Sequence, residues 1–261
     1  MSVIISKGKK NEHLKYIKAN FHKYSQREIA RKLNLGKTTV NTWAREEGLK
    51  FKKDTVNNKF FDEFNENSIY ILGFIFADGN VAWNPKKGYY TLTITASEKD
   101  IEHLEKIRKI MSSTKPLLYA VKTKSYRLIV NDKELCRRLM YLGVIPKKSL
   151  IVKFPKIPKE YLRHFIRGVI DGDGNVRYVE RSRSSYFEIT IASGSQVFCE
   201  GFIKAIKENL GINANIRNVG QNTKIIQYSC SRGEKLAEYI YSKANIFLER
   251  KHNEYERFRR N

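Results

Sequence analysis

The chain has 261 residues and a mass of 30.6 kDa, which is enough for one large domain or two to three small ones. Hydrophobic residues make up 41% of it, so the composition excludes disorder of the whole chain and allows sizeable buried cores. Fifty Lys and Arg residues against 27 Asp and Glu residues give a net charge of +23, which favours a polyanionic partner, with nucleic acid as the leading class. The alternative is a basic, soluble protein without such a partner.

The sequence predicts neither a membrane protein nor a secreted one. Its longest apolar run, residues 69–77, is far shorter than the ~20 residues that cross a bilayer, and no signal-peptide pattern opens the chain. Cys136, Cys199 and Cys230 are widely spaced, without a C-x-x-C pair, which indicates reduced thiols and no zinc site. We therefore expect a cytoplasmic protein, and the abundance of Lys, Asn, Ile and Tyr fits a bacterial or phage gene from an AT-rich genome.

The first 55 residues predict a small all-α domain. Ser25-Gln-Arg-Glu28 is a capping box that starts a helix at about Ser25. This helix ends at Asn34, which tolerates a left-handed backbone, and residues 12–21 supply a preceding helix. A third helix follows, and the arrangement resembles a helix-turn-helix DNA-binding module.

The third helix carries the residues that we expect to contact DNA in this domain. With Val40 and Trp43 packed inward, its outer face presents polar side chains that can bind base edges and phosphates. These residues are Thr38, Thr39, Asn41, Thr42 and Arg45. The first 55 residues hold 14 Lys and Arg against 5 Asp and Glu, a net charge of +9, which favours DNA binding over an ordinary helical hairpin.

From residue 67 onward the chain repeats itself. Residues 67–81 are echoed by residues 162–176, and each copy is followed by two strands, a helix, two further strands and another helix. The later helices are expected at residues 98–111 and 195–210, and the later strands at residues 117–122, 126–130, 212–219 and 225–230. The order αββαββα, twice, predicts an α+β fold of two pseudo-symmetric repeats.

The repeated motif predicts a tightly packed pair of helices. Gly73 and Ala77 are four residues apart, as are Gly168 and Gly172, so each motif helix has a strip almost without side chains. We expect the two helices to pack along this strip and form the seam between the repeats. Each helix ends at an Asp-Gly pair, whose glycine is free to adopt the turn that starts the next strand.

This packing would bring Asp78 and Asp173 together at one end of the seam. Two carboxylates do not lie close together as bare anions unless they are protonated or neutralised by cations. Hard divalent ions, Mg²⁺ first, suit oxygen ligands, and two of them can position water for in-line attack on a phosphodiester. The alternative, in which both residues only cap their helices, is less favoured because the same context occurs twice.

The segments Leu72-Gly-Phe-Ile-Phe-Ala-Asp-Gly79 and Ile166-Arg-Gly-Val-Ile-Asp-Gly-Asp-Gly174 closely resemble the paired motifs of LAGLIDADG homing endonucleases, over about residues 60–261. The resemblance implies a single-chain monomer with internal pseudo-two-fold symmetry, whose motif helices form the interface. Two four-stranded sheets would form a saddle over double-stranded DNA. The eighth residues of the motifs, Asp78 and Asp173, would bind the metal ions that cleave both strands across the minor groove. The expected domains are residues 1–55 (helix-turn-helix module and linker), 56–157 (first repeat) and 158–261 (second repeat).

The resemblance also implies the cofactor and further site residues. It implies two or more Mg²⁺ ions, with Ca²⁺ supporting binding without cleavage, and it makes the carbonyl groups of Ala77 and Gly172 additional candidate ligands. Family members end each repeat with a basic residue that polarises the solvent at the cleavage site, and Lys148 and Lys251 occupy the matching places. A cation near the scissile phosphate would stabilise developing charge, and solvated surface lysines are the alternative.

The two motif copies differ at their sixth position, where the first has Phe76 and the second has Asp171. We expect this difference to alter packing rather than metal binding. It leaves the two halves unequal.

Strand alternation predicts which side chains of the two sheets face DNA. Polar positions alternate with apolar ones, and their side chains can contact bases and phosphates or can simply be solvated. Alternation gives Thr91, Thr93 and Thr95 in the first repeat and Asn213, Asn215 and Arg217 in the second. Further candidates for base or phosphate contacts are Lys122, Lys124 and Arg127 in the first repeat and Arg177, Tyr178, Lys224 and Gln227 in the second. The turn residues Lys86-Lys87 and Arg181 to Arg183 suit phosphate contacts better than base contacts.

Three functions fit this set of features. The first is a site-specific, Mg²⁺-dependent double-strand DNA endonuclease, and the presence of both motif acids favours it. The second is a non-catalytic, sequence-specific DNA-binding regulator on the same fold. The third is an intron RNA maturase, because a basic surface does not exclude RNA as a partner.

Overall fold

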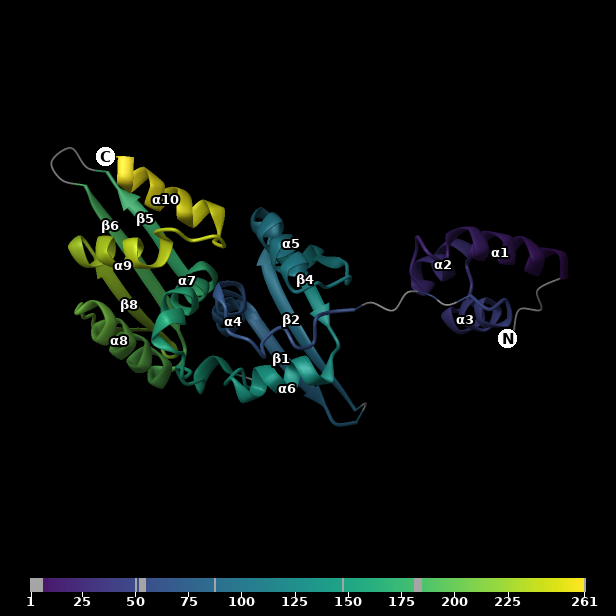
Figure 1. Cartoon of the computed structure of the whole chain (residues 1–261), viewed down its shortest axis with the longest axis horizontal. Coiled ribbons are helices and arrows are strands. Elements are labelled where there is room, and N and C mark those ends of the chain that lie inside the picture. Colours follow the sequence, from purple (N-terminus) through teal and green to yellow (C-terminus); the bar gives the residue numbers. More distant parts are fainter. Residues whose placement is uncertain are drawn as a thin grey trace. The chain divides into compact units, whose positions relative to one another are not determined.

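The computed structural model describes residues 7–49, 51, 55–86, 88–146, 148–180 and 185–260. The chain divides into two compact units, Met1–Asp54 and Thr55–Asn261, and each is described by itself (Figure 1). Among the described residues, no helix has the length and apolar character that a membrane span requires.

The first unit is all-α, as the sequence predicts. Its helices are α1 (Lys7–Asn20), α2 (Gln26–Leu33) and α3 (Lys37–Glu46). The capping box is formed, because the Ser25 hydroxyl accepts from the Glu28 amide at 3.3 Å and the Glu28 carboxylate accepts from the Ser25 amide at 2.8 Å. Asn34 has the expected left-handed backbone, with φ 51°. Ile17, Ile29 and Val40 are fully buried where the helices meet.

The second unit contains the two predicted repeats, and the α+β fold class is confirmed (Figure 1). The first repeat consists of α4 (Glu66–Asp78), β1 (Gly79–Asn84), β2 (Tyr89–Ser97), α5 (Ile101–Ile110), β3 (Leu117–Ala120), β4 (Ser125–Val130) and α6 (Lys133–Tyr141). The second consists of α7 (Leu162–Asp173), β5 (Gly174–Val179), β6 (Tyr186–Ser193), α8 (Gln196–Leu210), β7 (Ile216–Val219), β8 (Thr223–Ser229), α9 (Ser231–Tyr241) and a further helix, α10 (Glu249–Arg260). Short 3-10 helices lie at Glu98–Asp100, Val121–Thr123, Lys148–Leu150 and Lys159–Tyr161.

The described strands form two antiparallel sheets with the same topology, β1-β2-β4-β3 and β5-β6-β8-β7. Helices α5 and α6 pack on the first sheet, and α8, α9 and α10 pack on the second. Leu92 and Ile94 of β2 are buried beneath these helices, as are Ile189 and Ile191 of β6. We call this helix-bearing side of each sheet the covered face and the other side the open face.

Several element boundaries differ from the sequence predictions. The helix expected at residues 98–111 begins as a 3-10 turn and becomes α-helical at Ile101. The strand expected at residues 117–122 ends at Ala120, because a 3-10 turn follows. The strand expected at residues 212–219 is hydrogen-bonded only from Ile216. Burial still alternates before that point, since an extended backbone keeps this periodicity without ladder hydrogen bonds.

Helices α4 and α7 pack against each other between the two sheets, through the strips of small residues (Figure 1). A Cβ added at Gly73 would lie 2.2 Å from the Phe165 carbonyl oxygen, and one added at Gly168 would lie 2.1 Å from the Tyr70 carbonyl oxygen. Both distances are far below van der Waals contact. Glycine is therefore required at these two positions, and the predicted seam is confirmed.

The glycines that follow the two motif acids have a different role from the predicted one. Gly79 has φ −93° and Gly174 has φ −87°, so both are extended rather than in a glycine-specific turn conformation. A Cβ would instead lie 2.6 Å from the Ile75 carbonyl oxygen at Gly79, and 2.5 Å from the Ile170 carbonyl oxygen at Gly174. Lack of space, not backbone conformation, is what demands glycine here.

The sixth motif position differs between the copies in its packing, as expected. Phe76 lies among aromatic rings, with the Phe165 and Phe198 ring centres 5.2 and 6.2 Å away. Asp171 is 1% exposed and accepts three hydrogen bonds, from the hydroxyls of Tyr70 (2.7 Å) and Tyr241 (2.8 Å) and from the Leu248 amide (2.8 Å). Because Tyr70 belongs to the first repeat, this buried carboxylate joins the two halves. Burial and the Asp171 charge raise the pKa of both tyrosines well above the usual value.

We predict that Gly168→Ala destabilises the second unit by about 3 kcal/mol, because the new methyl group forces α4 and α7 apart. Urea unfolding measures the loss. Gly211→Ala is the control within the same unit: that site has open space but φ +67°, so only the backbone strain of about 1 kcal/mol is expected. Equal losses of unfolding free energy in the two variants would contradict the conclusion that the packing of α4 on α7 requires glycine at position 168.

Candidate functional site

Asp78 and Asp173 are the last residues of α4 and α7, and they lie at the same end of the seam. The close packing continues to this end, since a Cβ added at Gly172 would lie 2.3 Å from the Ala77 Cβ and 3.4 Å from Asp78 Oδ2. The carboxylate of one motif therefore lies beside the backbone that carries the other. Both acidic residues keep part of their surface exposed, although the packed helix ends around them remove part of the water from their carboxylates.

The protein around these acids disfavours their negative charge. Loss of hydration is the main cause, and with the charge of Asp173 it raises the pKa of Asp78 to about 6. Loss of hydration also raises the pKa of Asp173. Lys148 and Lys251 act in the opposite direction on both acids. The positive charges of the two lysines therefore only partly offset the cost of two negative carboxylates here. The site favours the binding of a further cation.

Lys148 and Lys251 are not surface lysines. They are 9% and 2% exposed, so the alternative of solvated surface charges is wrong for both. Lys148 donates to the carbonyl oxygens of Phe76 and Ala77, the latter at 2.8 Å. Each lysine belongs to the end of its own repeat and caps the C-terminal carbonyls of that repeat's motif helix, where the helix dipole favours a cation.

Lys251 is bound by more carbonyl groups than Lys148. Its ammonium donates to the carbonyl oxygens of Ile170 (2.8 Å), Asp171 (2.7 Å), Gly172 (3.4 Å) and Gly174 (2.5 Å). Loss of hydration lowers its pKa to about 8, although the nearby negative charge of Asp171 opposes the shift. Lys148 shows a lowered pKa for the same main reason.

The donor set fits a hard divalent cation. Two carboxylates and nearby backbone carbonyls offer oxygen ligands, which Mg²⁺ and Ca²⁺ prefer. Of the carbonyls that we expected as further ligands, Ala77 accepts from Lys148 at 2.8 Å and Gly172 lies 3.4 Å from the Lys251 ammonium, and each oxygen keeps a second lone pair for a metal ion. Within the described part of the chain, no cluster of three or more His, Cys, Asp or Glu side chains could hold a metal. Water or a bound phosphate would have to complete the coordination of any ion at Asp78 and Asp173.

Most of the predicted DNA-contacting residues of the sheets lie on the open faces. The strand register places Thr91, Thr93, Thr95 and Arg127 on the first open face and Arg177, Arg217 and Gln227 on the second. Asn213 and Asn215 are exposed just before β7. Lys122, Lys124 and Lys86 are exposed in turns rather than on strands. Lys87 and Arg181 to Arg183, which we expected to contact phosphates, lie outside the described residues.

Two of those predictions are corrected by the register. Tyr178 pairs with the buried Phe187 on the covered face, where its ring lies 6.0 Å from that of Phe258 on α10. Lys224 pairs with Ser193 on the covered face and acts electrostatically on Cys199 of α8. In both cases the residue was one position out of phase with the DNA-facing side, because side chains alternate strictly along a strand.

The predicted residues of the first unit all lie on α3. Thr38, Asn41 and Arg45 are exposed, whereas Thr39 and Thr42 are half-buried. Asn41 accepts a hydrogen bond from the Gln26 side chain at 2.6 Å, which fixes its orientation on the helix surface.

Glu188, a polar residue of the second open face, is not among the contact residues predicted from the sequence. It is 5% exposed and binds Arg177 and Gln227, two of the predicted contact residues. Its position in the alternation of β6, between Phe187 and Ile189, is the signal that could have identified it.

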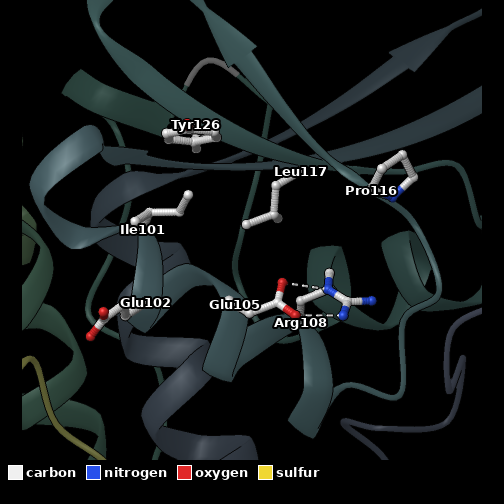
Figure 2. A pocket seen from close by; sticks show the side chains of 7 residues that line it. All are labelled: Ile101, Glu102, Glu105, Arg108, Pro116, Leu117 and Tyr126. Atoms are coloured by element: carbon white, nitrogen blue, oxygen red, sulfur yellow. Dashed lines mark hydrogen bonds and ion pairs between the residues drawn. The ribbon is translucent and has the colours of Figure 1, made fainter.

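The structure also contains a pocket away from these residues, with a volume of about 580 Å³ (Figure 2). Figure 2 shows Glu105 and Arg108 of α5 paired at its rim, opposite Leu117 and Tyr126 of the sheet. None of the predicted site residues lines it.

Comparisons with known proteins agree with this architecture. The family model of a LAGLIDADG-like domain matches residues 160–246, most of the second repeat. An uncharacterized protein of Methanocaldococcus jannaschii is 28% identical over 152 residues, which are 57% of this chain and 52% of that protein. The chain therefore spans about half the length of the curated relative that it matches.

Solved structures share the fold at low identity. The homing endonuclease I-GzeII in complex with its DNA target has a TM-score of 0.52 and 12% identity, covering 76% of this chain and 89% of that one. A mesophilic variant of the homing endonuclease I-DmoI has a TM-score of 0.53 and 16% identity, covering 75% and 98%. The meganuclease I-SmaMI bound to uncleavable DNA has a TM-score of 0.51 and 11% identity, covering 73% and 88%. The chain thus carries a LAGLIDADG-like domain and has the fold of the LAGLIDADG homing endonucleases.

Proposed function

We propose that this protein is a site-specific DNA endonuclease that hydrolyses both strands of double-stranded DNA with divalent metal held by Asp78 and Asp173. The observation that carries the proposal is the pair of adjacent, under-compensated carboxylates at one end of the seam, each accompanied by a buried lysine. This arrangement occurs in a chain of net charge +23, between two sheets with polar open faces.

The partner and the domain roles follow from the same features. The homing endonuclease I-GzeII and the meganuclease I-SmaMI are bound to DNA in their solved structures, which supports DNA as the partner here. Residues 56–157 and 158–261 would each contribute one open face to a long target site, within a monomer. Residues 1–55 would act as a helix-turn-helix module that extends or steers the footprint.

In the mechanism, Asp78 and Asp173 would hold the divalent metal at the end of the seam, beside the scissile phosphates. Mg²⁺, when bound there, would supply charge neutralisation and a water of lowered pKa for in-line attack. Lys148 and Lys251 keep the two helix ends in place and add positive charge beside the developing negative charge of the phosphate. The seam fixes the separation of the two acids, because neither motif helix can shift without breaking close backbone contacts.

The first experiment is a selection with a randomised duplex-DNA library, performed in Mg²⁺ and in parallel in Ca²⁺, with sequencing of cut ends and of the bound fraction. Cleavage at one long site in Mg²⁺ supports the endonuclease. Specific binding without cutting in either metal contradicts it and indicates a DNA-binding regulator.

We expect Asp78→Asn to lower the cleavage rate in Mg²⁺ by ~100-fold or more, since several kcal/mol of transition-state stabilisation depend on the bound ions. DNA affinity in Ca²⁺ should change little, because the substitution removes charge but almost no volume. Asp62→Asn is the control, because Asp62 is an exposed partner of Arg138 and precedes the N-terminal end of α4, whereas Asp78 is at the C-terminal end. An unchanged cleavage rate in the Asp78 variant would show that Asp78 is not part of the catalytic site.

Lys148→Met should slow cleavage by ~100-fold with little loss of affinity, as expected for a group that stabilises developing charge. In the metal-free protein it should also raise the pKa of Asp78 above its value of about 6, because Lys148 favours the ionised carboxylate. Single-turnover kinetics, binding in Ca²⁺ and NMR titration of the carboxyl group measure the three effects. The exposed Lys153→Met is the control. Equal losses of binding and cleavage would make Lys148 a phosphate anchor instead.

For the first unit, combining Asn41→Ala with Arg45→Ala in the full chain should weaken DNA binding by ~10-fold, with an unchanged cleavage rate at saturating protein. Lys9→Ala, which removes one exposed positive charge from α1, is the control and should have a smaller effect. If both changes weaken DNA binding equally, the first unit attracts DNA only through its general positive charge, and α3 makes no base-specific contacts.

A further inference from the structure

The open face of the second sheet contains a buried carboxylate surrounded by its own donors. Glu188 lies on β6, and only 6% of its side chain is exposed, although it is on the side without helices. Arg177 of β5 is directly opposite, and its Nε donates to Glu188 Oε1 at 2.8 Å, while its Nη2 forms an ion pair with the same oxygen at 2.5 Å. On the other side, Gln227 Nε2 and the Ser229 hydroxyl, the latter at 3.2 Å, both donate to Glu188 Oε2.

This network fixes which groups Arg177 and Gln227 can offer to a ligand. A carboxylate only accepts hydrogen bonds, so the Gln227 amide must turn its nitrogen toward Glu188. That nitrogen also donates to the Ser229 hydroxyl at 3.0 Å, which leaves the amide oxygen as the group for an external donor. Arg177 uses one side of its guanidinium on Glu188, so the Nη1–Nη2 end of the fork remains for an external acceptor. The Arg177 side chain is 52% exposed and therefore accessible.

We propose that Glu188 is a positioning residue that holds Arg177 and Gln227 as one unit for reading a guanine–cytosine base pair. The end of the Arg177 fork matches the two acceptors of guanine, O6 and N7, which Arg binds in a bidentate manner. The Gln227 oxygen matches the N4 amino donor of cytosine. Glu188 does not contact the base, since both of its oxygens are occupied. This inference rests on the proposed binding of DNA by the open faces.

The first repeat lacks a counterpart of the Glu188, Arg177 and Gln227 cluster, so the proposed base preference applies to only one half of the DNA target. In the matching register position of β2 stands Thr91, and Ala82 is opposite it. The Thr91 hydroxyl donates to the Asn131 side chain at 3.0 Å, with no cation or carboxylate in the pair. The target should therefore show a guanine–cytosine preference at one base pair without a symmetry-related counterpart in the other half.

The test compares base preferences of full-length variants, bound in Ca²⁺ to the randomised duplex library and sequenced. Wild type should prefer guanine–cytosine at one pair, and Glu188→Gln should lower that preference by about tenfold with other positions unchanged. The new amide keeps only one acceptor oxygen, so its NH2 group would face the donors of either Arg177 or Gln227 and Ser229, and Arg177 and Gln227 would no longer be held together. Arg177→Met, at an exposed site, should lose the same preference, and the double variant should lose no more. Glu208→Gln removes one negative charge from exposed α8 and should leave the profile intact.

The outcomes separate this inference from the proposed function. A sequence-specific wild type whose preferences survive Glu188→Gln and Arg177→Met overturns the inference and leaves the function intact. Uniform weakening at every position in Glu188→Gln, with unchanged base preferences, also overturns it and assigns Glu188 a purely structural role. A wild type that enriches no sequence overturns the inference together with the proposed DNA recognition.

Discussion

The close packing of α4 on α7 is the constraint on which the rest of the second unit depends. Gly73 and Gly168 leave no room for side chains, so each backbone lies directly against the other. This contact sets the distance between the two sheets, because each motif helix continues into the first strand of its own sheet. It also brings Asp78 and Asp173 to one end of the seam, an arrangement unfavourable for two negative charges. The site is thus a consequence of how the halves pack.

Two buried lysines make that arrangement tolerable. An ammonium taken out of water is unfavourable unless carbonyl or carboxylate oxygens replace the lost hydration. Lys148 and Lys251 obtain such oxygens from the last turns of α4 and α7, which have unpaired carbonyls at just that place. Each lysine therefore satisfies the end of a helix and partly balances the acids beyond it. The lysines thereby link the folding of the helix ends to the electrostatics of the candidate site.

Local patterns in the sequence predicted most of the fold. The alternation of Leu92 and Ile94 with threonines identified the two faces of the first sheet, and the repeated Gly-x-x-x-Ala or Gly strip identified the seam. Tyr178 and Lys224 were predicted to contact DNA on the basis of residue type, whereas the strand register places both on the covered face. The burial of Lys148, Lys251 and Asp171 depends on residues ~70 to 100 positions away in sequence, and no local pattern encodes such contacts.

The two repeats have the same sheet topology, but their buried polar residues differ. Asp171 binds tyrosines from both repeats, whereas Phe76 at the equivalent position packs only against rings. On the open faces, Glu188 organises its neighbours where the first sheet has Thr91. A symmetric dimer cannot differ in this way, because any substitution appears in both subunits. Joining two repeats in one chain removes that restriction, so each sheet is free to present a different set of hydrogen-bond donors and acceptors while the seam and its paired acids stay nearly symmetric.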